Sequence, residues 1–599
     1  MFQSFESHAS PSQGPTRLAA LRAQLAMVGL DGFLVPRADV HQGEYVAARD
    51  ERLQWLTGFT GSAGLCIVLP GVAGVFIDGR YRTQVKVQVD LGAFTPVPWP
   101  EVKPGEWVRD HLAAGKVGFD SWLHTSEEVE RIENSLEDSG VILCSKSINP
   151  IDEIWPDQPD APSGKVFVHP DALAGETAAD KRARLAKDLR SAGQNAAVLT
   201  LPDSICWLLN IRGADVPKNP VVQGFAILHD DGQVDLFVAA AKLDDTVRAH
   251  LGPEVVLRAP EDFPAALAAL AGPVRVDKSS APLAVSTILR DAGVKVVWGD
   301  DPCKLPKARK NAAEIAATRE AHLRDGAAMA EFLCWLDDRT PKGGLTEIAV
   351  VQALEGFRRA TNALHDISFD TICGAGPNGA IIHYRVTEGT DRLIRQGELL
   401  LVDSGGQYPD GTTDITRTIA VGDPGDESRE CYTRVLQGMI AISRARFPKG
   451  VSGRDIDALA RYPLWLAGQD YDHGTGHGVG AFLSVHEGPQ RISRLSEVPL
   501  EPGMILSNEP GYYREGAFGI RLENLIVVKE APAMGDDRHH LAFETLTWAP
   551  FDRRLVLPDR LARGERNWLN AYHTATLEKL GSRVSPATFE WLSRATAPI

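Results

Sequence analysis

The sequence is poor in cysteine, and its cysteines are not spaced for a structural role. The 599 residues include only seven cysteines, an odd number, and no two of them form a Cys-x-x-Cys pair. Neither a disulfide framework nor a thiolate zinc site is predicted from scattered thiols of this kind. A reducing cytoplasm suits them best.

Long apolar runs are also missing. No stretch approaches the ~20 apolar residues that a membrane-spanning helix needs. Residues 1–15 are polar and lack the basic start and apolar block of a secretory signal. We therefore expect a soluble, cytoplasmic protein.

Positive charge is in deficit, because 63 basic residues face 79 acidic ones and leave a formal net charge of −16. Nucleic acids and anionic membranes are bound by clustered Lys and Arg, so neither is an expected partner. The composition, 44% hydrophobic and 24% charged, is that of an ordinary globular protein. The length predicts roughly three to five domains.

A unit of helix followed by strand occurs twice. Residues 17–36 place leucines on one helical stripe, stop at a glycine and enter an apolar strand, and residues 182–202 repeat this pattern. Two related α/β domains are therefore predicted, at about 1–162 and 163–311. The Pro/Asp-rich stretch 155–162 separates them.

The pattern then changes to a long helical segment at 312–338, which opens a third domain predicted to span 312–548. Further helices are expected at 347–361 and 430–446. The remainder, 549–599, reads as an amphipathic extension packed on the third domain.

The third domain contains a predicted hairpin at 399–419. An apolar, β-rich run is followed by a Gly/Pro/Asp cluster and then by alternating Thr and Ile. Asp410 is well explained as a turn residue. Asp403 is not, because it directly follows four apolar residues, and an ionised carboxylate there needs a cation or several donors.

The register of this hairpin decides how its two carboxylates meet. With a loop centred between Tyr408 and Pro409, Asp403 and Asp414 lie directly opposite, with Cβ atoms roughly 4.5–5.5 Å apart. Such a pair would suit two metal ions. A centre one residue later is also compatible with the turn residues and would place the side chains diagonally. We predict the first register.

Three further stretches carry chemistry at the ends of apolar runs. Residues 472–480 hold His473 and His477 between glycines, and residues 504–513 place Glu509 at the end of an apolar strand. In 518–528 a clear strand puts Arg521 and Glu523 on one face, where Arg521 can hold the carboxylates in orientation. Thr416 is likewise two residues from Asp414, so the two side chains are expected on the same face of their strand.

Two Asp, two Glu and one His form a set that suits a hard or borderline divalent ion such as Mn²⁺, with Zn²⁺ or Co²⁺ as alternatives. Packed carboxylates would repel one another unless about two divalent cations lay among them. Each residue also has a simpler reading: Glu509 could pair with a nearby arginine, Glu523 with Arg521 alone, and His477 could be a core histidine. Their joint occurrence favours the metal site.

Taken together, these motifs resemble a known family. They are Asp403-x10-Asp414, His473-Gly-Thr-Gly-His477-Gly-Val-Gly, Glu509-Pro-Gly-Tyr-Tyr and Gly-Ile-Arg521-x-Glu523-Asn. The set resembles the creatinase/aminopeptidase fold and, over essentially the whole chain, the three-domain Xaa-Pro aminopeptidases. The implied fold class is α+β, with a "pita-bread" catalytic domain preceded by two related creatinase-like α/β domains.

The resemblance also implies roles for individual residues. Asp403, Asp414, His477, Glu509 and Glu523 would bind two metal ions, with Asp414 and Glu523 shared between them. A metal-bridging water or hydroxide would be the nucleophile. Glu509 would act as general base.

Three further histidines match non-ligand active-site residues of the family. His383, His473 and His486 would hold the substrate and stabilise the tetrahedral intermediate. From the sequence alone, a buried structural histidine explains His383 about equally well. The implied reaction removes the first residue of a peptide whose second residue is proline, and the implied assembly is a homodimer.

Related activities remain as alternatives. A prolidase has the same five ligands but usually one N-terminal domain, whereas this chain has two. Creatinase lacks the metal set, and methionine aminopeptidase lacks the N-terminal domains. Catalytically inactive binding modules of this fold typically lose the ligands, all five of which are present here.

Overall fold

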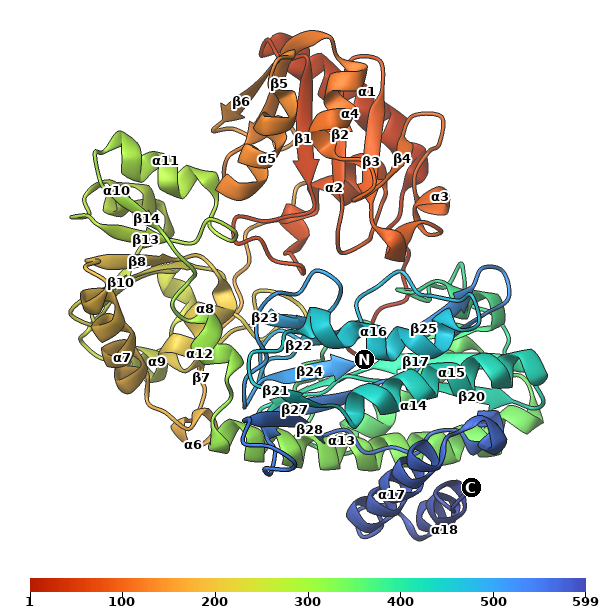
Figure 1. Cartoon of the computed structure of the whole chain (residues 1–599). Coiled ribbons are helices and arrows are strands. Elements are labelled where there is room, and N and C mark those ends of the chain that lie inside the picture. The colour runs from red at the N-terminus through yellow and green to blue at the C-terminus, as the bar shows by residue number, and fades with distance from the viewer. The chain divides into compact units, whose positions relative to one another are not determined.

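The computed structural model describes all residues, 1–599, and divides into two compact units. One is His8–Lys304, and the other combines Met1–Ser7 with Leu305–Ile599 (Figure 1). The first residues belong to the second unit because the Gln3 side chain exchanges hydrogen bonds of 3.3 and 2.8 Å with the backbone of Thr371. None of the helices combines the length and hydropathy needed to cross a lipid bilayer.

The unit His8–Lys304 contains two six-stranded sheets with the same strand order. The first runs β4-β3-β2-β1-β5-β6 and the second β12-β11-β10-β8-β13-β14. In the first sheet β3, β2 and β1 pair antiparallel, and in the second β11, β10 and β8 do the same. All other strand pairs in the two sheets are parallel. The predicted pair of related α/β domains is confirmed.

The strands of the first sheet are β1 (Gly32–Pro36), β2 (Leu65–Val68), β3 (Ala73–Ile77), β4 (Thr95–Pro98), β5 (Ala114–Asp120) and β6 (Gly140–Lys146). Those of the second are β8 (Ala196–Leu199), β10 (Phe225–His229), β11 (Val234–Phe237), β12 (Val255–Arg258), β13 (Val274–Val276) and β14 (Val296–Trp298). A helix precedes each central strand, α1 (Gly14–Met27) before β1 and α7 (Ala178–Ser191) before β8. These helices occupy the two repeated segments of the sequence.

The unit formed by Met1–Ser7 and Leu305–Ile599 opens with the 28-residue helix α13 (Ala312–Arg339). Asn311 caps it, because its side chain accepts hydrogen bonds from the backbone N–H groups of Ala313 and Glu314. The other large helices are α14 (Glu347–Arg359), α15 (Asp426–Ser443) and α16 (Gly453–Trp465). Helix α15 begins four residues before its predicted start, because Asp426 and Glu427 extend its first turn with favourable negative charge.

Two sheets hold the candidate chemistry. The smaller has the order β16-β17-β20, formed by Ile372–Ala375, Glu398–Ser404 and Ile415–Val421. The larger has the order β21-β28-β27-β24-β22-β23, formed by Arg446–Pro448, His540–Thr545, Asn524–Glu530, Ile505–Asn508, Gly476–Gly478 and Glu487–Ile492. Shorter strands complete the unit: β15 (Asp366–Ile367), β18 (Gly406–Tyr408), β19 (Gly411–Thr412), β25 (Gly511–Arg514) and β26 (Phe518–Arg521).

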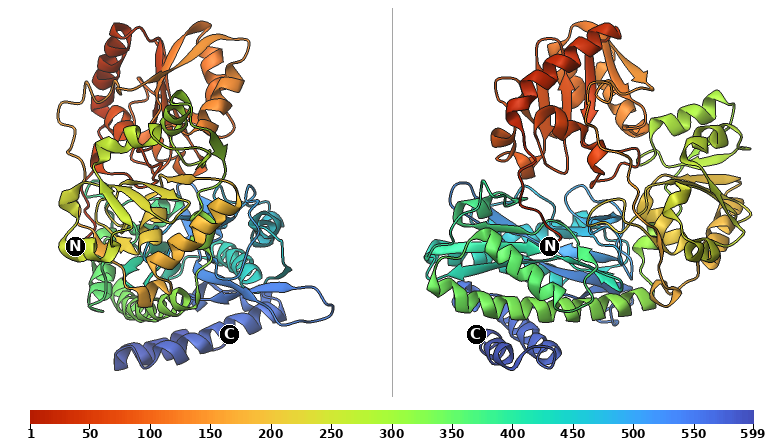
Figure 2. Two further views of the ribbon diagram at one scale, coloured as in Figure 1. Left: turned by 90° about the vertical axis from the view of Figure 1, so that its left-hand side faces the viewer. Right: turned by 180° about the vertical axis from the view of Figure 1, so that it is seen from behind.

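The C-terminal extension forms two helices, α17 (Arg563–Leu580) and α18 (Pro586–Ala595), which pack against α13 (Figure 2). Leu569, Leu580 and Leu592 are buried in this contact region and in the adjoining core. Tyr572 reaches further inward, since its hydroxyl accepts a 3.0 Å hydrogen bond from the guanidinium of Arg417. The extension therefore supports β20, the second strand of the carboxylate hairpin.

Candidate metal centre

The register of the carboxylate hairpin differs from the predicted one. Asp403 pairs with Thr416, so the turn is centred between Pro409 and Asp410, one residue later than predicted. Asp414 therefore lies diagonal to Asp403 and not opposite it. The prediction of directly opposed carboxylates is wrong, and the alternative register is the correct one.

Helix α13 explains this register. Asp410 accepts two hydrogen bonds of 2.9 Å from the guanidinium of Arg324, and the Tyr408 hydroxyl donates to Asp325 at 2.8 Å. Asp325 in turn forms a buried ion pair with Arg358 at 2.8 Å. These contacts fix both flanks of the turn, so Asp410 is a turn residue, as predicted, with an ion-pair partner that the sequence did not indicate.

The predicted ligands nevertheless converge. Potential ligand atoms lie within 4.8 Å of one another in three overlapping groups: Asp403 with Asp414 and Glu523, His477 with Glu509 and Glu523, and Asp414 with His477 and His486. Strand β17 supplies Asp403 and strand β22 supplies His477, while the other ligands follow or precede strand ends. Two sheets thus meet at one carboxylate-rich centre.

The imidazole of His477 is oriented for coordination. Its Nδ1 lies 3.0 Å from the carbonyl oxygen of Gly478, a geometry that requires the proton on Nδ1. Its Nε2 lies 3.5 Å from Asp414 Oδ2 and 3.4 Å from Glu509 Oε1. Its Nε2 therefore faces the carboxylates, which is the arrangement a metal ligand needs.

The carboxylates lack enough hydrogen-bond donors. Asp403 Oδ1, Asp414 Oδ1 and Glu523 Oε1 are buried and have no hydrogen-bond partner. Burial, together with the neighbouring carboxylates, raises the pKa of Asp414 and of Glu523 well above its usual range. An oxygen-rich donor set with one imidazole and unpartnered buried oxygens fits divalent cations.

Arg521 and Thr416 are hydrogen-bonded to predicted ligands, although Thr416 bonds Glu523 and not Asp414, the carboxylate two residues before it in the strand. Arg521 donates from Nη2 to Asp403 Oδ2 at 2.6 Å and from Nε to the Thr416 hydroxyl at 3.3 Å. That hydroxyl donates to Glu523 Oε2 at 2.8 Å. One arginine therefore links two carboxylates that come from different sheets.

The three other predicted histidines differ in how they relate to the centre, and only His486 belongs to one of the ligand groups. The ring of His486 is perpendicular to that of His477, with centroids 4.3 Å apart. His473 lies farther out, and its Nε2 is 2.9 Å from the Tyr513 hydroxyl, which accepts from Arg521 at 2.6 Å. His383 occupies a turn next to Arg385, whose backbone bridges to strand β16.

Sequence reasoning missed several supporting residues. Arg417 is fully buried and donates to the backbone carbonyl oxygen of Glu523, and Tyr572 joins it from the C-terminal extension. Alternation along the strand places Arg417 on the opposite face from Thr416, so its sequence position carried no signal. Tyr513 is the last residue of the Glu509-Pro-Gly-Tyr-Tyr motif, so its place in that motif was a signal for a supporting role.

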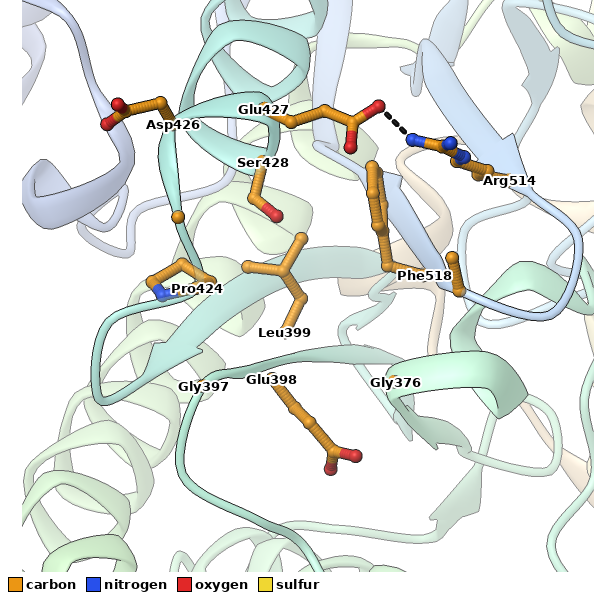
Figure 3. Close-up of a pocket in the computed structure, with 12 residues that line it drawn as sticks. Gly376, Gly397, Glu398, Leu399, Pro424, Asp426, Glu427, Ser428, Arg514 and Phe518 are labelled. Carbon is orange, nitrogen blue, oxygen red and sulfur yellow. Dashed lines mark hydrogen bonds and ion pairs between the residues drawn. The ribbon is translucent and has the colours of Figure 1, made fainter.

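A separate cavity of about 530 Å³ opens in this unit (Figure 3). Its lining includes Leu399, near the start of β17, and Phe518, at the start of β26, whereas Asp403 and Arg521 lie towards the other ends of those strands. An ion pair between Glu427 and Arg514 faces it. None of the predicted site residues is among those that line this cavity.

Comparison with protein families gives four matches along the chain. Residues 316–530 match metallopeptidase family M24, and residues 539–599 match the C-terminal region of the same peptidases. Residues 17–154 and 157–314 each match a creatinase/prolidase N-terminal domain.

Full-length relatives share this organisation. A probable Xaa-Pro aminopeptidase P from Talaromyces stipitatus is 38% identical over 97% of this chain and 92% of its own length. One from Tuber melanosporum is 39% identical over 98% of this chain and 99% of its own length.

Solved structures give the same result. The X-prolyl aminopeptidase of Caenorhabditis elegans, described as a cytosolic enzyme with a di-nuclear active site, has a TM-score of 0.93 at 32% identity and covers 98% of this chain and 99% of its own. An Xaa-Pro dipeptidase from Bacillus anthracis has a TM-score of 0.52 at 25% identity. The whole dipeptidase matches only 64% of this chain.

Proposed function

The chain belongs to metallopeptidase family M24, together with the Xaa-Pro aminopeptidases, and from this premise we propose that it removes the N-terminal residue from peptides whose second residue is proline. The observation that carries the proposal is the group of buried carboxylate oxygens without hydrogen-bond partners. The full-length match to aminopeptidases, against a partial match to the dipeptidase, favours peptides over dipeptides as substrates.

Five residues would hold two divalent metal ions: Asp403, Asp414, His477, Glu509 and Glu523. The di-nuclear active site of the nematode relative supports the number of ions. Mn²⁺ is the ion we propose, because four carboxylates and one imidazole make a harder donor set than typical zinc sites provide. When bound, such ions lower the pKa of a coordinated water and polarise the substrate carbonyl.

We propose that Glu509 moves the proton. Its Oε1 accepts a 3.0 Å hydrogen bond from the Ser507 hydroxyl and lies beside His477 Nε2. We assign it as the general base that takes a proton from the attacking water and delivers it to the proline nitrogen as the C–N bond breaks. The water oxygen forms the new bond to the carbonyl carbon, so atoms and charge balance.

The peripheral histidines would orient the peptide. We propose that His383, His473 and His486 donate hydrogen bonds to the substrate and to the oxyanion of the tetrahedral intermediate. Proline makes a tertiary amide without an N–H group and with a fixed φ. A rigid site can therefore recognise the ring by shape.

Cleavage assays test this proposal directly. With Mn²⁺ present, the tripeptide Xaa-Pro-Xaa should release its first residue, while the matched Xaa-Ala-Xaa peptide should react at least about 100-fold more slowly, as expected for a site that recognises the ring. Chelation should abolish cleavage, and Mn²⁺ should restore it. Product analysis by mass spectrometry provides the measurement.

Two outcomes would change the assignment. Cleavage of the dipeptide Xaa-Pro without cleavage of the tripeptide would indicate a prolidase. No cleavage of any peptide, with no bound metal by elemental analysis, would indicate a binding module of the same fold.

We also propose a cytoplasmic homodimer. The cytosolic relative and the seven free cysteines support the location. The end of α16 supports the assembly, because Tyr462, Trp465 and Leu466 are 59%, 43% and 72% exposed. Arg494 lies over the Trp465 ring, and Leu495, the next residue, is 86% exposed.

Sedimentation equilibrium should give twice the 64.9 kDa chain mass for the unmodified protein. The variant Leu466→Glu should shift it towards the monomer, because a charge in an apolar interface is not solvated. Exposed Leu393, which is outside this patch, provides the matched control as Leu393→Glu. A monomeric unmodified chain would contradict the proposal.

We propose the division into 1–162, 163–311, 312–548 and 549–599 as the domain organisation. The four matched family regions support it, and each falls almost entirely within one of these ranges. Residues Met1–Ser7 lie in the first of these ranges by sequence, but they pack with the compact unit formed by Leu305–Ile599.

A further inference from the structure

A second buried carboxylate of this unit lies outside the metal centre. Glu347, the first residue of α14, has no exposed surface. Its carboxylate accepts hydrogen bonds from the backbone N–H of Ala375 at 2.7 Å, from the Asn378 side chain at 3.0 and 3.1 Å, and from the Tyr384 hydroxyl at 3.0 Å. All of these donors are neutral, so ion pairing does not explain the burial of this charge.

Two of the donors flank His383. Asn378 lies five residues before it, in the short helix Gly376–Ala380, and Tyr384 follows it directly. Between them the chain makes two successive turns, with Ile381 N–H donating to the Asn378 carbonyl and Tyr384 N–H donating to the Ile381 carbonyl, both at 3.1 Å. One carboxylate therefore holds both ends of the segment that carries the histidine.

The same segment is fixed against the strands of the metal centre. A Cβ on Gly519, in strand β26, would lie 1.7 Å from the carbonyl oxygen of Gly379, so the two backbones are in direct contact. Strand β26 ends at Arg521, which donates to the ligand Asp403. The segment is thus held between Glu347 on one side and a metal-centre strand on the other.

We infer that Glu347 is a positioning residue that sets the place of His383 relative to the metal centre, through Asn378 and Tyr384. This inference rests on the role proposed above for His383. It adds a residue that does not touch the substrate.

The chemistry of the carboxylate supports this role. Burial raises the pKa of Glu347 to about 7, and hydrogen bonds from Ala375, Asn378 and Tyr384 oppose the shift. Glutamine would avoid this desolvation cost but offers one acceptor oxygen in place of two. Both oxygens of Glu347 accept hydrogen bonds from the segment that carries His383. Glutamine could accept only some of these hydrogen bonds, because it has one acceptor oxygen.

Steady-state kinetics of the full, Mn²⁺-loaded chain test the inference. Glu347→Ala should lower kcat on Xaa-Pro-Xaa by about 10–100-fold, the range for residues that orient a functional side chain, with KM changed less than about threefold and both ions retained. Glu347→Gln should recover most of the loss, because it keeps an acceptor. When His383 is already alanine, adding Glu347→Ala should lower kcat by a further factor of less than about two. The two effects are not additive, because Glu347 acts through His383.

Glu355→Ala is the matched control. Glu355 is a buried glutamate of the same helix, and it accepts from the backbone N–H of Phe2 at 2.9 Å, so its loss should leave kcat unchanged. If Glu347→Ala does not fold, the combined variant Asn378→Ala/Tyr384→Phe replaces it, and its kcat is again measured with and without His383→Ala.

Several results would overturn the inference. An equal loss of kcat with and without His383 would show that Glu347 acts elsewhere, and loss of bound metal would show a general structural role. An unmodified chain that cleaves no Xaa-Pro peptide would refute the proposed function and the inference with it. An active chain in which Glu347→Ala keeps its kcat would refute the inference alone.

Discussion

Replacing Glu523 with glutamine is expected to lower kcat/KM on Xaa-Pro-Xaa by at least about 10³-fold, equivalent to roughly 4 kcal/mol. Glu523, like Asp414, belongs to two of the ligand groups: one with Asp403 and Asp414, and one with His477 and Glu509. Its Oε1 is buried without a hydrogen-bond partner, and its Oε2 accepts a hydrogen bond from the Thr416 hydroxyl. The amide removes one negative charge and one anionic donor from both ions.

Metal content separates this effect from misfolding. Elemental analysis should find less than two ions per chain in the Glu523→Gln variant, while its circular dichroism should match that of the unmodified protein. Glu530→Gln, at the exposed end of the strand that follows, is the matched control and should retain both ions and full activity. Full activity of Glu523→Gln would contradict the ligand assignment.

Removal of the metal ions is expected to produce the second large effect, a fall in melting temperature of at least about 5 °C. A ligand present at about 1,000 times its Kd stabilises the folded state by roughly 4 kcal/mol, and chelation removes that contribution. The melting temperature should fall further than the loss of binding free energy alone would cause. Without the metal ions, the carboxylates of Asp403, Asp414 and Glu523 repel one another. Differential scanning calorimetry with and without chelator provides the measurement.

The pH dependence of the metal-free protein has a definite sign. Burial first, and the neighbouring carboxylates second, raise the pKa of Asp414 and Glu523 in the folded chain above their unfolded values. A raised folded pKa gives a stabilising contribution that is complete below the unfolded pKa, near 4, and is lost as pH rises through the raised value. The metal-free protein should therefore melt at a higher temperature at pH 6 than at pH 8.

The metal-loaded protein should show the opposite trend, because protons compete with the ions for the same oxygens. The Glu523→Gln variant offers a further check. Without metal at pH 8 it should melt no lower than the unmodified chain, since one repelling charge has been removed. A melting temperature that is unaffected by chelation would contradict the metal centre.

Local sequence patterns determined much of this protein. The repeated helix and strand segments predicted two related α/β domains, because hydrophobic periodicity is a local property that each segment carries by itself. The proposed ligand set also came from local pattern, because Asp403, Glu509 and Glu523 stand at the ends of apolar strands, where an ionised carboxylate needs a partner. Arg521 followed from the period of a single strand.

The tertiary structure decided what depends on residues far apart in the chain. The hairpin register was predicted wrongly because the turn residues allow two centres, and the choice is made by Arg324, which holds Asp410 across 86 residues of sequence. Likewise, Tyr572 supports Arg417 from 155 residues away, and Glu347 holds the His383 segment across 31 residues to Asn378. Local pattern fixes which residue types lie on one strand, but only packing brings separate strands into contact.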